Sequence, residues 1–432
     1  MNVLIIGGGA REHALARQIA SEPGTTVVCA PGNPGIAREV PVAPVDVNDP
    51  DAVLALADAI GAHLTVIGPE APLAAGVADR FLRAGRPIFG PTRAAAQLET
   101  SKAFAKGIME RHGVPTAASI VCETADEAMR ATASGQLGWP VVVKADGLAA
   151  GKGVVIAPDR PSAEAAVRAA MIDDAFGAAG ARVVLEECLT GEELSYFVIA
   201  AGERFVACGS AQDHKRLFDG DHGPNTGGMG AFAPSVLMTD ELRARIDREV
   251  VTPVLAGMAA EGTPFVGFLY CGLMLAADGP KVNEFNCRFG DPEAQVVLPL
   301  LAQPLAPLLL AASTGAALPA HAEFSTDVAV GVVLASAGYP SQPQTGQVIN
   351  GLERAAAQHP TVLLRFASVA EHDGRLVTAG GRVLTVVGRA GTYADAIRSA
   401  YAAADCIAFE GLQRRSDIGA RAQRPLPSHE QP

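Results

Sequence analysis

Residues 282–293 read V-N-E-F-N-C-R-F-G-D-P-E, a strand pattern that ends in a sharp turn. Every second side chain of a β-strand points to the same face, so Glu284, Asn286 and Arg288 are predicted to share one face. A carboxylate and an amide oxygen are ligands that Mg²⁺ accepts beside nucleotide phosphates, and a guanidinium suits a carboxylate or a phosphate. For this triplet alone, an exposed strand edge with ordinary polar residues remains the alternative.

A glycine-rich loop between two strands is predicted for residues 141–156, V-V-V-K-A-D-G-L-A-A-G-K-G-V-V-I. Lys144 ends the first apolar run, and Lys152 lies in the loop. Glycines let backbone amides approach phosphate oxygens closely, and lysines add positive charge. The loop is not a Walker A motif, because only three residues separate Gly147 from the next glycine, and Gly153 stands where Ser or Thr would bind the metal. A solvated turn with two lysines is the alternative.

A third stretch, V-V-L-E-E-C-L-T-G-E-E-L-S at residues 183–195, runs from an apolar strand through acidic residues and a turn into a second strand. Together the three stretches resemble the ATP-grasp enzymes, in which ATP lies between two sheets. The resemblance implies that residues 186–189 contact adenine, that Glu193 meets the ribose hydroxyls, and that Lys102 and Lys144 touch phosphates. The implied ATP-binding residues are Lys102, Lys144, Gly151, Lys152, Gly153, Glu186, Glu187, Leu189 and Glu193.

A narrower resemblance covers residues 1–422 in the expected order. Its motifs are M-N-V-L-I-I-G-G-G-A-R-E-H-A at 1–14, G-P-E at 68–70, G-P-T at 90–92, Q-D-H-K-R at 212–216, N-T-G-G-M-G-A-F-A-P at 225–234, Y-C-G-L-M at 270–274, the stretch at 282–293, and R-S-D-I-G-A-R-A at 415–422. On these motifs the chain is similar to the phosphoribosylamine–glycine ligase family of purine biosynthesis.

This resemblance implies an ATP-dependent ligase that joins glycine to 5-phosphoribosylamine. Glycyl phosphate would form first, and amine attack would then give glycinamide ribonucleotide, ADP and phosphate. ATP would be the co-substrate, with Mg²⁺, or Mn²⁺ in its place, held by Glu284 and Asn286. The expected catalytic residues are Arg288, Lys144 and Asp213.

The substrate-binding residues that the resemblance implies are Gly9, Asn33, Glu70, Asp213, Lys215, Gly227, Gly228, Met229, Arg288 and Asp291. Within this set, Asp213 is expected to meet the glycine ammonium and Lys215 a phosphate. A flexible loop is the alternative for residues 227–229, and turn formation is the alternative for Asp291, which otherwise supports Arg288 or contacts substrate. His214 is expected to be structural or solvent-facing, and Cys287 to pack in the core.

The opening G-G-G-A-R-E suggests a second class, an NAD-dependent dehydrogenase. Strand, glycine-rich turn and helix suit a phosphate, but Glu12 replaces the third glycine and no acid follows the second strand to hold a ribose. A sister ATP-grasp ligase would not share H-K-R, T-G-G-M-G and R-S-D-I-G in this order. A non-catalytic nucleotide-binding module would have lost the charged residues that are present here.

Composition restricts the partners. A net charge of −12 leaves no basic surplus for nucleic acid, and seven cysteines without a C-x-x-C pair indicate neither zinc nor a disulfide framework. The sequence begins with a strand pattern, and no apolar run reaches the length of a membrane span. The expectation is a cytoplasmic enzyme, a monomer by family resemblance, with a transient contact to the preceding pathway enzyme left open.

The chain of 432 residues is long enough for two to four domains. The expected fold is multidomain, α/β and α+β. Residues 1–101 would form an N-terminal doubly wound parallel sheet for substrate, and residues 102–325 an ATP-grasp unit with a small lid at 121–190. Residues 326–422 would form a C-terminal mixed α/β domain, followed by a tail at 423–432.

Overall fold

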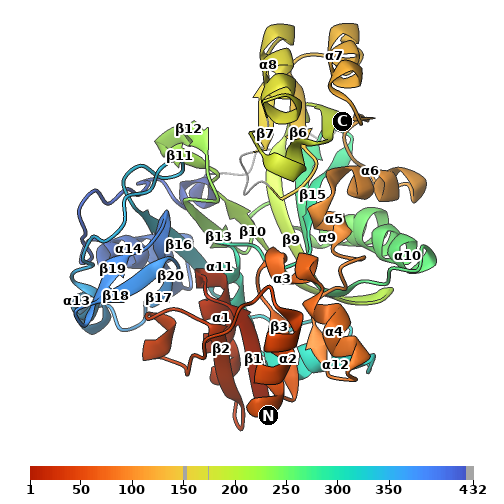
Figure 1. Cartoon of the computed structure of the whole chain (residues 1–432). Coiled ribbons are helices and arrows are strands. Elements are labelled where there is room, and N and C mark those ends of the chain that lie inside the picture. The colour runs from red at the N-terminus through yellow and green to blue at the C-terminus, as the bar shows by residue number, and fades with distance from the viewer. Residues whose placement is uncertain (149–152, 174, 425–432) are drawn as a thin grey trace.

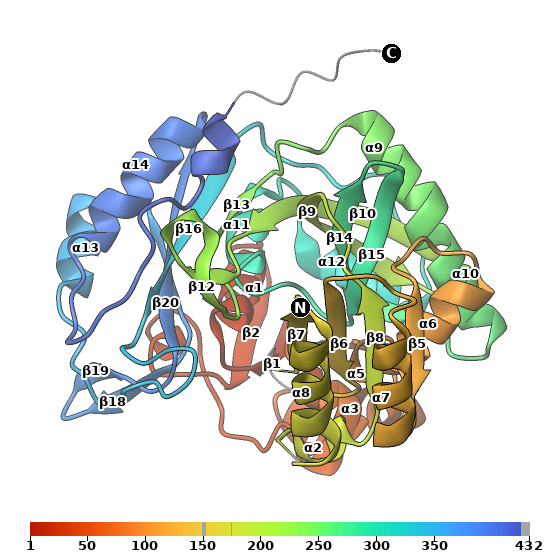
Figure 2. The same ribbon diagram turned by 90° about the horizontal axis from the view of Figure 1, so that it is seen from above.

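An eight-stranded sheet forms the centre of the computed structural model, which describes residues 1–148, 153–173 and 175–424. The strands lie in the order β15-β14-β9-β10-β13-β16-β20-β17, and each neighbouring pair is antiparallel. Their bounds are β9 Glu192–Ala201, β10 Arg204–Asp213, β13 Gly230–Ala233, β14 Val266–Ala276, β15 Gly279–Asn286, β16 Val328–Ala335, β17 Leu363–Phe366 and β20 Arg382–Ala390. Figure 2 shows this sheet extending across the molecule.

The N-terminal part is a parallel sheet with helices on both faces, as predicted. Its strands, in the order β2-β1-β3-β4, are β1 Asn2–Gly7, β2 Thr26–Pro31, β3 Leu64–Ile67 and β4 Ile88–Phe89. Alternate residues of β1 enter different cores: Val3 and Ile5 pack with α1, whereas Leu4 and Ile6 pack with α2 and α4. The helices are α1 Ala10–Ala20, α2 Pro50–Ala59, α3 Glu70–Ala75 and α4 Val77–Arg83.

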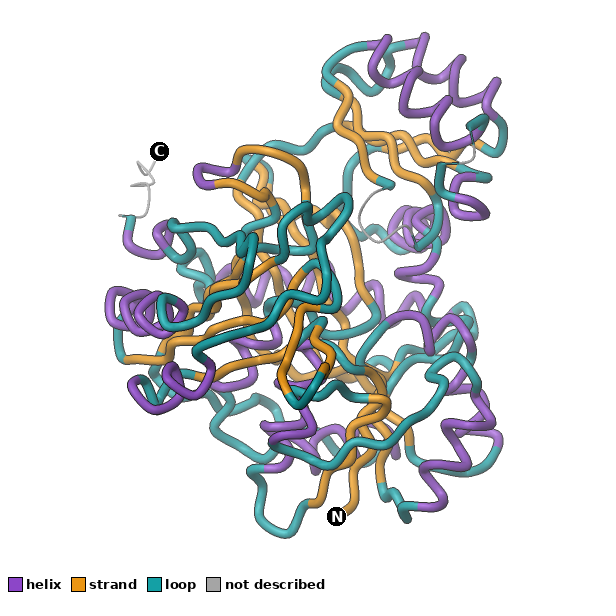
Figure 3. The backbone as a smooth tube through the Cα atoms, turned by 60° about the vertical axis from the view of Figure 1, so that its left-hand side comes forward, coloured by secondary structure: helices purple, strands orange, loops and turns teal. Residues whose placement is uncertain are grey.

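A small four-stranded sheet stands apart from the rest of the molecule, with two helices on one face (Figure 3). Its order is β5-β8-β6-β7, with β5 Ser119–Cys122, β6 Val141–Ala145, β7 Val154–Ala157, β8 Val183–Glu187, α7 Ala125–Ser134 and α8 Arg160–Met171. We call this unit, residues 119–187, the lid. Its buried apolar residues form a core of their own. The predicted strand–loop–strand at 141–156 is confirmed, but Gly151 and Lys152 lie outside the described residues.

Three C-terminal strands, β16, β20 and β17, continue the central sheet, whereas β18 Val369–His372 and β19 Arg375–Thr378 form a separate two-stranded sheet. The short strand β13 pairs with β10 on one side and with β16 on the other. Helices α13 Leu352–Gln358 and α14 Tyr393–Ala404 cover this end, and β18 pairs with β19 in antiparallel register. All but the first two residues of the predicted tail lie outside the described part of the chain.

The remaining helices connect these parts (Figure 1). They are α5 Gln97–Thr100, α6 Lys102–Arg111, α9 Asp240–Ile246, α10 Thr252–Ala260, α11 Ala294–Val297 and α12 Leu305–Thr314, and a two-stranded hairpin joins β11 Arg216–Phe218 to β12 His222–Asn225. Within the described ranges, no helix combines the length and apolarity required to cross a bilayer. The multidomain α/β and α+β class expected from the sequence is confirmed.

Candidate active site

A buried carboxylate orders two lysines beneath the lid. Glu186 of β8 is 3% exposed, and its Oε2 accepts from Lys144 Nζ at 2.9 Å and pairs with Lys106 Nζ at 3.1 Å. Lys144 also donates to the carbonyl of Asn283 at 3.0 Å, so it bridges the lid and strand β15. Burial lowers the pKa of Lys106, and the charge of Glu186 opposes this effect. No role was predicted for Lys106 from the sequence.

Lys102 lies at the start of α6, beside the lid loop. Its Nζ donates to the carbonyl of Gly147 at 3.1 Å, and burial is the main cause that lowers its pKa. Among nearby charges, Glu284 raises and Lys144 lowers the pKa of Lys102, so the three side chains lie within electrostatic reach of one another. This cluster provides the positive charge that a polyphosphate requires.

The predicted triplet on one face is found, although the strand ends earlier than expected. Strand β15 ends at Asn286, and Arg288 lies in the following turn. Arg288 Nη2 nevertheless donates to Asn286 Oδ1 at 3.3 Å. The guanidinium also pairs with Glu70 at 3.2 Å and with Glu99 at 3.1 Å. Burial lowers the pKa of Arg288, but the charges of Glu99 and Glu70 outweigh it and raise the pKa.

Glu284 is exposed to the cleft and surrounded by cations. Desolvation raises the pKa of its carboxyl, but the charges of Lys215, Lys144 and Arg288 outweigh desolvation and hold the pKa below its ordinary value. The carboxylate is therefore ionised at neutral pH, as a metal ligand must be.

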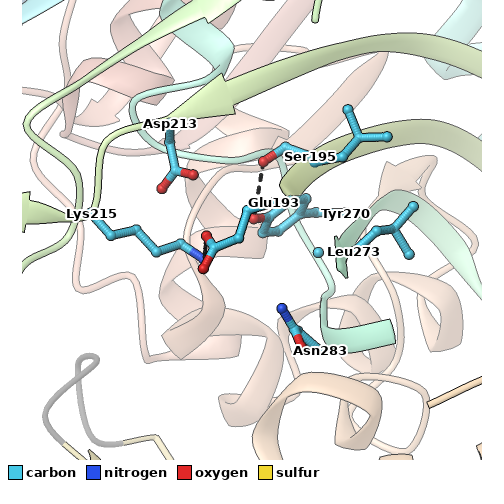
Figure 4. A pocket seen from close by; sticks show the side chains of 9 residues that line it. Glu193, Ser195, Asp213, Lys215, Tyr270, Leu273 and Asn283 are labelled. Atoms are coloured by element: carbon cyan, nitrogen blue, oxygen red, sulfur yellow. Dashed lines mark hydrogen bonds and ion pairs between the residues drawn. The ribbon is translucent and has the colours of Figure 1, made fainter. Parts of the chain in front are cut away.

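A polar pocket lies beside this carboxylate, between β9, β10 and β14 (Figure 4). Lys215 Nζ pairs with Glu193 Oε2 at 3.1 Å. Ser195 Oγ lies 3.2 Å from Tyr270 Oη and 3.2 Å from Glu293 Oε1. Ser195, Tyr270 and Glu293 lie within the quoted stretches, but no role was predicted for them, because only the tertiary fold brings β9, β14 and the turn after β15 together.

Two buried carboxyls of this pocket titrate near neutral pH. Burial raises the pKa of Asp213 to about 6, although the charge of Lys215 opposes the shift. Burial and then the charge of Asp213 raise the pKa of Glu293 to about 7. Burial lowers the pKa of Lys215, but Asp213 and Glu193 outweigh it and hold its pKa well above the ordinary value. The pocket thus presents concentrated negative charge, suited to an ammonium group.

The segment at residues 227–229, which we call the strap and which was predicted to bind substrate, is tied to the C-terminal part. Arg382 Nη1 donates to the carbonyl of Gly227 at 2.6 Å and to that of Asp291 at 2.6 Å. The Gly227 amide donates to Tyr339 Oη at 2.8 Å, and Met229 is fully buried. These bonds hold the strap against the turn that follows β15.

Asp291 was expected to support Arg288, the turn or a substrate. Its carboxylate instead accepts from Gln295 Nε2 at 2.8 Å and pairs with Arg382 at 3.3 Å. The turn after β15 directs this side chain toward Arg382 at the start of β20, and a role of Asp291 toward Arg288 or a substrate stays a prediction.

The predicted residues of the N-terminal part lie at the ends of β1, β2 and β3. The amide of Gly9 donates to Glu12 Oε2 at 2.7 Å. Glu12 therefore occupies the position that a pyrophosphate would need at this turn, which argues against the dehydrogenase alternative. The Asn33 amide group donates to the carbonyls of Gly8, Phe366 and Ala367 at 2.7–3.2 Å, so its side chain braces this turn.

The predicted adenine and ribose contacts lie along β8 and at the start of β9. Glu187 Oε1 accepts from the Ala118 amide at 3.0 Å, Leu189 follows the end of β8, and Glu193 is the partner of Lys215. Gly153 lies just before β7 and its carbonyl accepts from the Ala145 amide at 2.8 Å. The roles of these residues toward ATP stay predictions.

His214 and Cys287 are structural. His214 is 1% exposed, and Cys287 is 2% exposed with its Sγ directed at the carbonyls of Ala95 and Ala96. Burial is the largest cause that lowers the pKa of His214 to about 4, so the ring is neutral. The expectation of core packing for Cys287 is confirmed.

The donor set fits a cation that shares its coordination with a ligand. Among the described residues, no group of three or more His, Cys, Asp or Glu side chains could hold a metal ion. Glu284 and Asn286 supply two oxygens, and Mg²⁺ commonly completes its octahedron with phosphate oxygens and water.

Comparisons with known proteins agree with this geometry. Three family models of phosphoribosylglycinamide synthetase match the chain: the N domain at residues 1–99, the ATP-grasp (A) domain at 100–294 and the C domain at 329–421. A phosphoribosylamine–glycine ligase of Ralstonia nicotianae is 48% identical over 98% of this chain and 100% of that protein.

Solved structures share the fold. The phosphoribosylamine–glycine ligase of Thermotoga maritima has a TM-score of 0.85 and 36% identity, covering 96% of this chain and 100% of that one. The biotin carboxylase domain of the Hydrogenobacter thermophilus 2-oxoglutarate carboxylase, solved with MgADP and bicarbonate, has a TM-score of 0.69 at 17% identity, covering 96% of this chain and 91% of that one, and shows the fold alone. The chain therefore belongs to the phosphoribosylglycinamide synthetase family, whose members are ATP-grasp ligases.

Proposed function

We propose that this chain uses ATP to join glycine to 5-phosphoribosylamine, giving glycinamide ribonucleotide, ADP and phosphate in purine biosynthesis. Family membership supports the overall reaction. One observation carries the site assignment. The Glu284 carboxylate is surrounded by Lys102, Lys144 and Lys215, and it lies next to the acidic pocket of Asp213 and Glu293.

Phosphoryl transfer is the first step that we assign to the cleft. A glycine carboxylate oxygen attacks the γ-phosphorus of ATP, the bond from that phosphorus to the bridging oxygen breaks, and ADP leaves. Such transfer depends on positioning and charge neutralisation. Lys102 and Lys144 would neutralise phosphate oxygens, and Arg288 would hold the glycine carboxylate, because Glu70 and Glu99 fix its guanidinium. Glu284 and Asn286 would hold Mg²⁺, which would supply further neutralisation of phosphate charge; a distant relative of the same fold was solved with MgADP.

Amide formation is the second step. The amine of 5-phosphoribosylamine attacks the carbonyl carbon of glycyl phosphate, the new C–N bond forms, and the bond to the phosphate oxygen breaks. The amine loses a proton, which the leaving phosphate or solvent accepts. Meanwhile Asp213 would hold the glycine ammonium, and the backbone of residues 227–228 would lie against the phosphate.

Phosphoribosylamine is assigned to the junction of the N-terminal and C-terminal parts. Gly9, Asn33, Glu70 and Asp291 surround this position, and a Cβ atom placed on Gly9 would lie 2.8 Å from Glu12 Oε2. A larger residue at position 9 would therefore disturb the turn. We further propose that the protein acts as a monomer in the cytoplasm, where purine synthesis draws on ATP.

The test is release of ADP and phosphate with Mg-ATP, glycine and freshly generated phosphoribosylamine, with each omitted in turn. Release that requires both substrates, with a product of the mass of glycinamide ribonucleotide, supports the proposal. A requirement for another carboxylate or another amine would overturn the substrate assignment and leave the ATP-grasp fold intact.

A further inference from the structure

A buried arginine forms hydrogen bonds to the hairpin that borders the pocket. We call residues 216–225, which comprise β11, its turn and β12, the site hairpin; it lies on the same side of the molecule as the lid (Figure 1). Arg415 is 1% exposed, and its guanidinium bonds to both carboxylate oxygens of Asp417 at 2.7 and 2.6 Å. It also donates to Asp221 Oδ1 at 2.9 Å and to the carbonyl of Arg216 at 3.1 Å.

The turn of the hairpin is held from the same segment. The Ser416 amide donates to Asp219 Oδ1 at 2.8 Å, and the Gly220 amide donates to Asp417 Oδ2 at 2.9 Å. Tyr401 of α14 fixes this segment in turn, because its hydroxyl donates to the carbonyl of Arg415 and accepts from the Ile418 amide, both at 3.0 Å. The motif R-S-D-I-G thus links α14 to the site hairpin.

One end of the site hairpin leads to Lys215 of the pocket, and the other end leads into the strap. The amide and hydroxyl of Thr226 donate to the carbonyl of Lys215 at 2.7 and 2.9 Å. The Met229 amide donates to the carbonyl of His214 at 2.8 Å, and the Gly228 amide donates to Thr226 Oγ1 at 3.0 Å. A displacement of the hairpin would therefore shift Lys215 and the strap together.

Further polar contacts hold the hairpin beside the Arg415 fork, because Ser416 bonds to Asp219 and Arg421 pairs with Asp221. Both ring nitrogens of the buried His214 lack hydrogen-bond partners among the described residues, and the ring packs against Phe232 with centroids 6.1 Å apart. The fork of Arg415 supplies two directional bonds to the hairpin itself, at Arg216 and Asp221. A lysine could not reproduce them, because an ammonium lacks the planar fork that matches a carboxylate.

We propose that Arg415 and Asp417 are positioning residues that fix the site hairpin and thereby place Lys215 and residues 227–228 for glycine and phosphate. The kinetic part of this inference rests on the proposed function, whereas the structural part does not. The motif at 415–418 acts on the site through its contacts with the hairpin.

The experiment compares Arg415→Lys with Arg414→Lys in the full chain. Arg414 is a matched control, because it pairs with Asp405 and lies 5.7 Å from the Tyr401 ring without bonding to the hairpin. In Arg415→Lys, the KM for glycine should rise about tenfold or more, with the KM for ATP changed less than about twofold. Hydrogen–deuterium exchange of residues 214–230 should accelerate, and Arg414→Lys should change neither quantity.

Asp219→Asn provides a milder second variant, because it weakens only the contact with Ser416. It should raise the KM for glycine and accelerate hydrogen–deuterium exchange of residues 214–230, as Arg415→Lys does. If Arg415→Lys does not fold, Asp219→Asn provides the test. Unchanged exchange in both variants, or equal effects in Arg414→Lys, would overturn the inference. If the wild type shows no glycine-dependent turnover, the proposed function fails while the exchange data still decide the structural part.

Discussion

At the scale of single residues, Glu284 provides the most direct test of metal binding. Glu284→Gln keeps the side-chain shape but removes the charge that Lys215, Lys144 and Arg288 surround. We expect kcat to fall about a hundredfold, and the Mg²⁺ concentration for half-maximal turnover to rise, because a neutral amide binds a hard cation more weakly. ADP release measured across a Mg²⁺ titration checks this.

Glu192→Gln is the control for this change, because Glu192 is an exposed carboxylate at the start of β9. It should leave the Mg²⁺ dependence unaltered. Near-normal turnover of Glu284→Gln at limiting Mg²⁺ would contradict the ligand assignment.

The pocket carboxyls predict how glycine binding depends on pH. Asp213 and Glu293 have pKa values raised to about 6 and about 7, so both lose their charge as pH falls through this range. The attraction for an ammonium is present above this window and lost below it. The KM for glycine should therefore rise as pH falls from 8, by up to about tenfold per unit between the two pKa values and more steeply below the lower one.

Glu293→Gln separates the two groups. This substitution should remove the change of glycine KM near pH 7. The change of glycine KM near pH 6, which belongs to Asp213, should remain. The KM for ATP, measured over the same range, is the reference, and a glycine KM that stays flat from pH 8 to about pH 5 would refute the assignment.

At the scale of elements, the end of strand β6 is fastened to helix α6. Asp146 accepts from the Ala103 amide at 3.0 Å and from Arg182 Nε at 2.5 Å, and Arg182 also reaches Ser101 Oγ at 3.3 Å. Arg182→Met should therefore loosen the lid and raise the KM for ATP about fivefold, with little effect on glycine. Steady-state kinetics with each substrate varied measures this.

Arg160→Met is a suitable comparison, because Arg160 pairs with Glu164 one turn along α8. Equal ATP KM values for Arg182→Met and the wild type would show that the lid is held by other contacts.

The helices and strands themselves were largely predictable from the sequence, whereas several of the strand pairings and side-chain contacts were not. Continuous apolar runs rich in β-branched residues, such as residues 328–335, indicate buried strands locally, and β16 is found there. Nothing local indicates that β13 joins β10 to β16, because a strand of four residues takes its neighbours from the tertiary fold. For the same reason Glu284 and Arg288 were found from one motif, but Ser195 and Glu99 were missed.

At the scale of the whole molecule, the continuous sheet makes the central and C-terminal parts interdependent. Strand β13 would have an unpaired edge without β16, and its buried residue Phe232 would lose the core it shares with Val330 and Leu384. The N-terminal part contacts the C-terminal end of this sheet, since the Phe366 amide of β17 donates to His13 Nδ1 at 2.9 Å. The lid alone has a core composed only of its own residues.

This difference predicts opposite outcomes for two deletions. A chain ending at residue 327 should aggregate or lack a cooperative thermal transition, because it exposes the apolar face of β13 and leaves that edge open. Replacing residues 119–187 by a short glycine linker should abolish turnover yet keep a cooperative transition within about 5 °C of the wild type. The ends to be joined are adjacent, because the Glu187 amide donates to the carbonyl of Ala118 at 3.0 Å. Thermal melting followed by circular dichroism, together with size-exclusion chromatography, distinguishes the two variants. A fragment 1–327 that melts like the full chain would show that the sheet does not couple the central and C-terminal parts.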